Sequence, residues 1–188
     1  MQRRLCFALA VLLLAFVLTG CVTAGNSSER VYNVGDVGPS GGLVFYDKGE
    51  FSDGWRYLEV APASTEIMAG WGYEGVAIET ETAVGSGASN TKMLLAQATF
   101  IAETAASYCD ALTVKKTTGW YLPSKDELAL LFSALGRTGK DTFRQEGFAY
   151  WSSSSFDERR SWAQGFSNAV QGRVEKSELL AVRAIRSF

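Results

Sequence analysis

The sequence contains no histidine among its 188 residues. Ser-His-Asp and Cys-His nucleophilic sites use an imidazole as the general base, and many zinc sites use one as a ligand. The chain also has no strong excess of either charge, with 18 Lys and Arg against 20 Asp and Glu. These absences exclude histidine-dependent hydrolases, predict no metal or other cofactor, and give no electrostatic indication of nucleic-acid binding.

The N-terminus has the three-part organisation of a secretory signal. Arg3 and Arg4 form a positive region, Leu5 to Leu18 is an almost unbroken apolar run, and small residues then precede Cys21. An N-terminal membrane helix is the alternative interpretation. The run is short for a membrane span, however, and polar and small residues follow it. The sequence therefore predicts export.

Residues 18–21, Leu-Thr-Gly-Cys, resemble the bacterial lipobox. That resemblance implies cleavage before Cys21, diacylglycerol on its sulfur and an acyl chain on the new amino terminus, which together give a stable anchor. We expect residues 1–20 to be the signal peptide, residues 21–30 a flexible tether and residues 31–188 one domain. The protein is then exported and lipid-anchored, at the outer membrane or cell surface.

The chain has few cysteines, and processing would leave fewer still. Cys6 leaves with the signal and Cys21 is lipidated, so only Cys109 remains. No intramolecular disulfide is then available in an oxidising compartment. Cys109 lies in a helical pattern, and we expect it to be a buried, inert thiol.

The first part of the domain has strand signals followed by a segment without a clear period. Residues 41–47 predict a strand that is apolar on both faces and therefore central. Residues 55–61 predict a second strand, joined to the first in a hairpin by a turn at 48–53. Residues 62–91 are rich in Gly, Ser, Thr and Ala and predict long irregular loops, with short ladders around 76–78.

Two helices are predicted next. One apolar stripe recurs at steps of three and four residues: Leu94, Ala98, Ile101, Ala105, Tyr108 and Leu112. This stripe predicts a helix over 92–113. A second helix is predicted from Ser124, which forms a capping box with Glu127, to Gly136.

The tail of the chain carries three predicted strands, at 148–153, 161–168 and 182–188. In the middle strand, two alternating sets of side chains point to opposite faces: Trp162, Gln164 and Phe166 against Ala163, Gly165 and Ser167. We take the first set as inward and the second as open. The order of elements predicts an α+β fold, with two helices packed on mixed or antiparallel sheets and long irregular loops between them.

Several aromatic and basic residues have both a functional and a structural interpretation. Trp120, Trp151 and Trp162 could stack on sugars, but core positions are the preferred interpretation. Arg183 and Arg186 could contact an acidic ligand, but we expect them to pair with carboxylates inside the protein.

The acidic and hydroxyl residues are expected to have structural roles and not catalytic or metal-binding ones. Asp36, Asp47 and Asp53 could ligate calcium, but their spacing does not match a calcium loop and favours turns. Residues 152–155 form a run of four serines without a base nearby in the sequence, so no activated nucleophile is predicted. The glycine-rich segment 35–42 lacks the lysine and the following helix of a phosphate loop.

Segments spread over the whole domain resemble one family. They are, in order, 34–42 with 44–47, the Gly-Trp-Tyr-Leu-Pro-Ser-Lys-Asp-Glu-Leu segment 119–128, 150–154, 162–166 and 182–186. Their order and spacing resemble the domain at the C-terminus of Legionella collagen-like adhesin, which is found in many bacterial surface lipoproteins. That resemblance implies a C-type lectin-like fold of the formylglycine-generating-enzyme type.

The chain further resembles the variable proteins of diversity-generating retroelements, in particular the variable lipoproteins of treponemes. In that family, error-prone copying of template adenines turns AAY asparagine codons into many residue types, but never into Lys, Glu, Gln, Met or Trp. The resemblance implies fixed scaffold positions wherever these types occur in the tail: Glu158, Trp162, Gln164, Gln171, Glu175, Lys176 and Glu178. It implies a candidate variable region at 152–181 with these ligand-binding positions: Phe156, Asp157, Arg159, Arg160, Ala163, Gly165, Val170, Gly172, Arg173, Val174, Ser177, Leu179 and Leu180.

Three functional hypotheses follow. Phe156 with Arg159, Arg160 and Arg173 would form a mixed aromatic and cationic patch, a typical composition of binding hot spots. The leading hypothesis is therefore a surface-displayed binding protein, with a protein or glycan as its ligand. The alternative is a fixed adhesin for a host glycan or glycosaminoglycan. An enzyme is the third, but the formylglycine-generating relatives use a cysteine pair, and processing leaves only Cys109 here.

Overall fold

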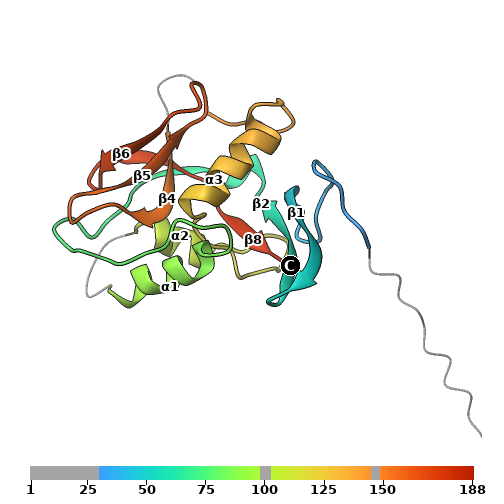
Figure 1. Ribbon diagram of the computed structural model, residues 1–188, viewed down its shortest axis with the longest axis horizontal. Helices are drawn as coiled ribbons and strands as arrows, with labels where there is room; N and C mark the ends of the chain where they lie inside the picture. The colour runs from blue at the N-terminus through green and yellow to red at the C-terminus, as the bar shows by residue number, and fades with distance from the viewer. Residues whose placement is uncertain (1–29, 98–102, 145–148) are drawn as a thin grey trace, which may run out of the picture. The chain divides into compact units, whose positions relative to one another are not determined.

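Eight strands and three α-helices are found in the described part of the chain, residues 30–97, 103–144 and 149–188 of the computed structural model (Figure 1). The predicted signal peptide, the predicted lipidation site at Cys21 and nearly all of the predicted tether lie outside these residues. Val31–Phe188 form one compact unit. The predicted α+β class is confirmed.

The predicted hairpin at the start of the domain is present with a shorter turn. β1 (Leu43–Ser52) pairs antiparallel with β2 (Trp55–Val60), so most of the predicted turn 48–53 belongs to β1. The chain reverses at Asp53 and Gly54, whose φ angles are 52° and 81°. Asp-Gly is favoured in two-residue hairpin turns because their central residues need positive φ. β8 (Ile185–Ser187) pairs with β2 and completes a three-stranded sheet.

β1 is an edge strand, so the prediction that 41–47 is central is wrong. Its apolar side chains are buried because the preceding segment folds back over this edge. The Gly35 N–H donates to the Val44 carbonyl at 2.8 Å, and the Val44 N–H donates to the Asp36 carbonyl at 2.9 Å. The apolar pattern was thus a correct sign of burial and a misleading sign of sheet position.

The segment 62–91 contains a strand that the sequence did not predict. η1 (Ala63–Thr65) is a short 3₁₀ turn, and β3 (Ile67–Gly70) then pairs antiparallel with β7 (Leu179–Val182). The ladders expected around 76–78 are absent, and these residues are irregular. The partner of β3 lies far along the chain, so no local pattern marks the pairing.

The single helix predicted over 92–113 is wrong. Two helices are present, α1 (Gly87–Ala96) and α2 (Ala105–Ala111), so the described residues contain three α-helices and not the two predicted. Thr104 is extended and begins α2 anew: its hydroxyl accepts from the Ser107 N–H at 3.1 Å, and the Ser107 hydroxyl accepts from the Thr104 N–H at 2.7 Å. This reciprocal cap outweighs the apolar stripe. Residues 98–102 lie outside the described residues.

The second predicted helix is confirmed as α3 (Lys125–Leu131). The Ser124 hydroxyl accepts from the Glu127 N–H at 3.2 Å, and the Glu127 carboxylate accepts from the Ser124 N–H at 2.7 Å. A wider π-helical turn, η2 (Phe132–Gly136), carries the helix to its predicted end. None of the helices in the described ranges has the length and apolar character that crossing a bilayer requires.

The tail strands build a five-stranded sheet in the order β3-β7-β4-β5-β6. β4 (Ala149–Ser155) and β5 (Arg160–Gly165) correspond to two predicted strands, whereas β6 (Gln171–Glu175) was not predicted. The strand predicted at 182–188 is divided, because β7 ends at Val182 and β8 belongs to the other sheet. β4 and β7 are parallel, and the other pairs are antiparallel.

Apolar clusters cover both faces of this sheet. Tyr150 and Trp151 are consecutive in β4 and therefore point to opposite faces. On the face of Trp151 the cluster includes Trp71, Leu94, Cys109, Trp120 and Val182. On the face of Tyr150 it includes Phe45, Leu128, Leu131, Phe166 and Ile185. Trp120 and Trp151 are core residues, as predicted. Cys109 is fully buried, as predicted, and burial raises the pKa of its thiol.

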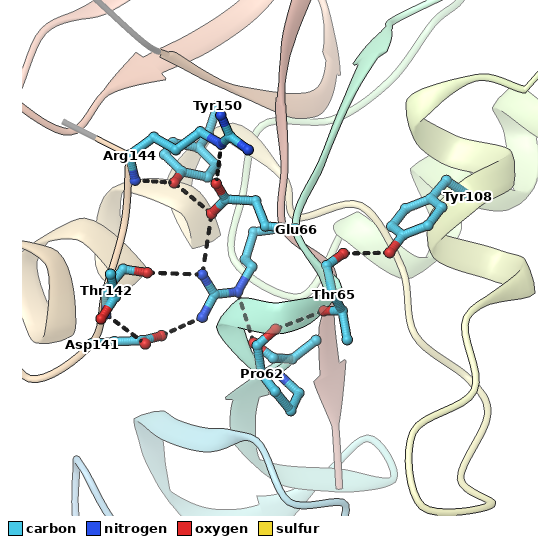
Figure 2. A network of polar contacts seen from close by, with 10 residues as sticks. Pro62, Thr65, Glu66, Tyr108, Asp141, Thr142, Arg144 and Tyr150 are labelled. Carbon is cyan, nitrogen blue, oxygen red and sulfur yellow. Dashed lines mark hydrogen bonds and ion pairs between the residues drawn. The ribbon is translucent and has the colours of Figure 1, made fainter. Parts of the chain in front are cut away.

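Arg183 has the predicted structural role. It is 1 % exposed, and its guanidinium donates to Glu66 at 3.2 Å and to Asp141 at 2.5 Å. Glu66 also accepts from Arg144 at 2.6 Å and from the Tyr150 hydroxyl at 2.6 Å (Figure 2). This network joins β3, β4 and the segment after η2. A buried cation is tolerated here because carboxylates and backbone carbonyls satisfy it.

The other charged residues considered in the sequence also have structural partners. The Arg186 guanidinium lies 3.4 Å from the buried Glu59 carboxylate, as predicted. Asp47 accepts from the Gly49 N–H at 2.7 Å and from Arg56 at 2.8 Å, and Asp53 occupies the turn of the hairpin. Asp36, which accepts from the Asn33 N–H at 2.8 Å, and Asp53 have the predicted turn roles, whereas Asp47 lies within β1.

Glu127 offers a sharp test of this packing. It is fully buried, and its two oxygens accept separately from the Ser124 N–H and, at 3.0 Å, from the Gly85 N–H. A glutamine would set its own NH₂ against one of these donors. We expect Glu127→Gln to lower the free energy of unfolding by about 1–3 kcal/mol in urea denaturation. Asp126→Asn is the matched control, with a 44 % exposed side chain and a loss below about 1 kcal/mol.

The same pair of proteins predicts a pH dependence. Burial raises the pKa of Glu127 above 4.5, so ionisation is less favourable in the folded than in the unfolded chain. Protonated Glu127 therefore contributes to the free energy of unfolding in full below pH 4.5. This contribution is lost as the pH rises through the raised pKa of Glu127. The difference in stability between wild type and Glu127→Gln should be larger below pH 4.5 than at neutral pH. Equal differences would contradict the account.

Candidate ligand-binding surface

β5 and β6 form a regular hairpin in the middle of the candidate variable region. Trp162 lies opposite Arg173, and Ala163 lies opposite Gly172. Residues directly opposite each other in an antiparallel pair share a face of the sheet. Trp162 and Arg173 therefore belong to one face of the hairpin, and Ala163 and Gly172 to the other.

An aromatic and cationic cluster occupies the first face. We call Phe156, Trp162 and Arg173 the aromatic–cationic face. The Phe156 and Trp162 rings meet edge to face at 5.6 Å, and the Arg173 guanidinium lies 3.9 Å from the Phe156 ring centre and 5.1 Å from that of Trp162. Lys125 adds a second cation 5.0 Å from the Trp162 ring. Trp162 is half-buried, so it is neither a full core residue nor a fully exposed stacking ring. Phe156 is 39 % exposed.

Asp157 fixes the loop beside this face. Its carboxylate accepts from the backbone N–H of Arg159 at 2.9 Å and of Arg160 at 2.7 Å, and from the Arg160 guanidinium at 2.9 and 2.6 Å. The Arg160 guanidinium lowers the pKa of Asp157 to about 2. The loop therefore keeps its ion pair at all physiological pH values and holds the exposed Arg159 at its tip.

Two hollows adjoin the loop, and residues 77–81 with Met93, which the sequence did not indicate as site residues, form part of their walls. One of about 720 Å³ lies between Ala77 and residues 157–160 with Glu175. The other, of about 540 Å³, is lined by residues 77–81, Met93 and residues 155–157. Only long-range bonds bring the irregular segment here, such as the one from the Gly75 N–H to the Glu158 carbonyl at 2.9 Å. No local sequence signal could have found them.

The run of serines in β4 attaches these segments to the sheet. Ser152, Ser153 and Ser154 are fully buried. The Ser152 hydroxyl donates to the Trp162 carbonyl at 2.7 Å, and that of Ser154 donates to the Glu81 carbonyl at 2.8 Å. The Ser153 hydroxyl accepts from the Asn90 amide at 3.1 Å. The hydroxyls thus hold loops and strands together and are not arranged around a reactive centre.

Lys176 closes the far end of the hairpin. Its side chain is fully buried, donates to the Val76 carbonyl at 2.9 Å, and lies 4.6 Å from the ring centre of Trp71. Its backbone N–H donates to the Arg159 carbonyl at 2.8 Å, and its carbonyl accepts from the Trp71 N–H at 3.0 Å. Burial lowers the pKa of this amine. One residue therefore joins the end of β6 to two loops.

The second face of the hairpin holds another group of predicted positions. A shallow hollow of about 210 Å³ is lined by Ala149, Ala163, Gly165, Ser167, Asn168, Val170, Gly172 and Val174. Val170 is 57 % exposed, and nothing lies within 4 Å of a Cβ added at Gly172. Ala163 is only 3 % exposed, so its predicted outward orientation is wrong. Both faces of the sheet are packed, and alternation along β5 therefore does not separate inside from outside.

The remaining predicted positions are Ser177, Leu179 and Leu180, and Ser177 lies exposed in the turn between β6 and β7. Leu179 and Leu180 begin β7, opposite Gly70 and Ala69 of β3. Leu179 is 64 % exposed, whereas Leu180 packs against the core cluster of Trp151. The predicted positions thus divide into three groups and do not form one open side. The group of Phe156, Asp157, Arg159, Arg160 and Arg173 is continuous with the two larger hollows, and it forms the candidate site.

The candidate site consists of aromatic, cationic and carboxylate side chains. Within residues 30–97, 103–144 and 149–188, no group of three or more Asp, Glu or Cys side chains is arranged to hold a metal ion. No family model matches the chain, and no curated protein matches it significantly. The resemblance to lectin-like surface lipoproteins therefore remains a prediction.

Proposed function

We propose that the protein is a lipid-anchored, surface-displayed binding protein whose ligand contacts the aromatic–cationic face and the loop 157–160. The single observation that carries this proposal is the exposed Phe156–Arg173 stack beside two open hollows. Aromatic residues and arginine supply most binding energy at protein interfaces. A guanidinium held on a ring also loses little freedom on binding.

The scaffold supports the same function. Loop 157–160 is held by Asp157, and the base of the hairpin is held by the buried Ser152 and Lys176. A preorganised surface loses less entropy when a ligand binds, and so gains affinity. The hollows are broad and open, which suits a macromolecular ligand better than a small molecule enclosed in a pocket. We further propose that the fold is C-type lectin-like and that region 152–181 is diversified by a retroelement.

A fixed adhesin for a host glycan is the second candidate. The partly exposed rings of Phe156 and Trp162 favour it, because sugars stack on aromatic faces. Against a sulfated glycan, three carboxylates, Asp157, Glu158 and Glu175, line the hollow beside Arg159. A protein ligand, which offers charges of both signs, suits this mixture better.

The proposal is of a binding protein and not of an enzyme. Cys109 would be the only thiol left after processing, and it is fully buried at a raised pKa, where a reactive thiolate is disfavoured. The hydroxyls of Ser152 and Ser154 are engaged with backbone carbonyls. These observations support binding as the function.

The binding proposal is tested by screening the mature protein on a glycan array and on an array of extracellular protein domains. For any ligand found, we expect Phe156→Ala and Arg173→Ala each to weaken binding at least about tenfold, because each removes half of the stacked pair. The matched control is Arg137→Ala, which removes an exposed arginine outside the site. Ligands whose affinity is unchanged by Phe156→Ala and by Arg173→Ala would contradict the proposal.

The anchor is tested separately with Cys21→Ser in the full chain. We expect the wild type to incorporate radiolabelled palmitate and to sediment with membranes, because acyl chains make the anchor. Cys21→Ser should lose the label and the membrane association, while Cys6→Ser should keep both. A labelled Cys21→Ser protein would show that the lipid is attached elsewhere.

A further inference from the structure

β6 is the outermost strand of the five-stranded sheet (Figure 1). The Gly165 N–H donates to the Val170 carbonyl at 2.8 Å, and the Lys176 N–H donates to the Arg159 carbonyl at 2.8 Å. Hydrogen-bonded pairs alternate with non-bonded pairs along an antiparallel ladder. The two bonds that flank β6 therefore fix which of its residues bond to β5.

By this alternation, Gly172 and Val174 direct their backbone N–H and C=O groups toward β5. Gln171, Arg173 and Glu175 direct theirs away from the sheet. Outward backbone groups on an edge strand are a template for another extended chain. β6 thus presents three residues in the correct spacing to pair with a further strand.

Both edges of the three-stranded sheet are protected in the described part of the molecule. β1 has irregular register and is covered by the segment 35–37, and β8 pairs with Tyr121. β6 has neither protection: its register with β5 is regular, and no segment of the described chain pairs with its outer side. It carries the charges of Arg173 and Glu175 but no proline and no β-bulge. Natural proteins usually block an edge with such devices. Their absence on β6 indicates an edge that is kept available.

The two sides of this edge have different surfaces for side chains. On one side lies the aromatic–cationic face with Arg173, and on the other lies the hollow of about 210 Å³ beside Gly172 and Val174. That volume is below the roughly 300–1,000 Å³ of small-molecule pockets and is enough for one apolar side chain. Successive side chains of an added strand would enter the two sides alternately.

Arg173 sets the charge of the fitting partner. Arg159 lies 3.7 Å from Glu175, and Arg160 lies 2.6 Å from Asp157. Arg173 is exposed, and in the described residues it has ring contacts but no ion pair with a carboxylate. A partner with an acidic side chain opposite Arg173 would complete the cluster.

We propose that the ligand is an extended polypeptide segment that adds to β6 as a further strand. It places an acidic side chain at Arg173 and a neighbouring apolar side chain in the hollow by Gly172. The inference rests on the proposed binding function and specifies its ligand as protein. Backbone pairing gives affinity that is independent of the side chains of β6, and the side chains then give specificity. Such a site keeps its binding mode while its side chains change.

The probe is a phage library of random linear peptides of about ten residues, sorted on the full mature lipoprotein in detergent micelles. We expect enriched peptides to alternate polar with apolar residues and to carry an acidic residue. The best peptide is then synthesised with alternate amides N-methylated. Methylation of the set that faces β6 should weaken binding at least about tenfold, and methylation of the other set should change it little.

Two variants separate backbone from charge. Arg173→Pro removes an outward N–H, which edge strands tolerate, and should abolish peptide binding. Arg173→Ala keeps the N–H, so it should lose the acidic preference but still bind peptides through the backbone. Amide hydrogen exchange of the wild type needs no variant: Arg173 and Glu175 should become protected with peptide, and Val174 should be protected with or without it.

The outcomes distinguish this inference from the proposed function. If no linear peptide binds, or if N-methylation of the peptide amides leaves binding unchanged, the strand-addition inference is overturned. Protection of the Arg173 amide by higher protein concentration alone would assign the edge to a second copy and would also overturn it. A glycan whose binding falls with Phe156→Ala, without any peptide binding, would leave the proposed function standing. Ligands that bind equally well to Phe156→Ala, Arg173→Ala and the wild type would contradict the strand-addition inference and the proposed function alike.

Discussion

Hydroxyl groups buried in β4 determine where the proposed binding surface lies. A buried hydroxyl without a partner costs about 1–3 kcal/mol, so each serine requires a matching group from another segment. The Ser152 hydroxyl donates to the Trp162 carbonyl and the Ser154 hydroxyl donates to the Glu81 carbonyl. The Ser153 hydroxyl accepts from the Asn90 amide. An apolar core strand would pack against many arrangements of these loops. The serine run specifies one, and it thereby places an irregular segment beside the exposed hairpin.

Burial in the tail agrees in part with the division into fixed and variable residue types. Gln164 and Lys176, which asparagine codons cannot yield by adenine change, are 2 % and 0 % exposed. Phe156, Val170 and Leu179, which they can yield, are all more than a third exposed. The division is incomplete, because Glu158 and Glu178, which they cannot yield, are exposed, and Ala163, which they can yield, is 3 % exposed. Substitutions at exposed positions such as Phe156, Val170 and Leu179 would cost little stability.

Local chemistry made part of the fold predictable. The Ser124–Glu127 cap and the Asp53–Gly54 reversal depend on neighbouring residues, and the sequence predicts both, although it predicts a longer turn at 48–53. The apolar stripe predicts one helix where there are two, because the cap of Thr104 with Ser107 begins α2 within the stripe. β3 and β6 were missed because their stability comes from distant strands.

The candidate site was only partly predictable. Phe156 and Arg173 were expected to form one patch, and they do, at 3.9 Å. Ala163 was misplaced because alternation marks an open face only where one side of a sheet is solvated. Residues 77–81 carry no local signal, because their position depends on bonds to β4 and to the loop 157–160.

The central claim is that a fixed interior presents a changeable binding hairpin, and sequencing the gene and its flanking DNA in independent isolates tests it most directly. The account predicts substitutions concentrated at exposed positions such as Phe156, Val170 and Arg173, constant Gln164 and Lys176, and a near-copy repeat beside a reverse transcriptase gene. An invariant tail without a repeat, or changes spread equally over Gln164 and Lys176, would contradict it.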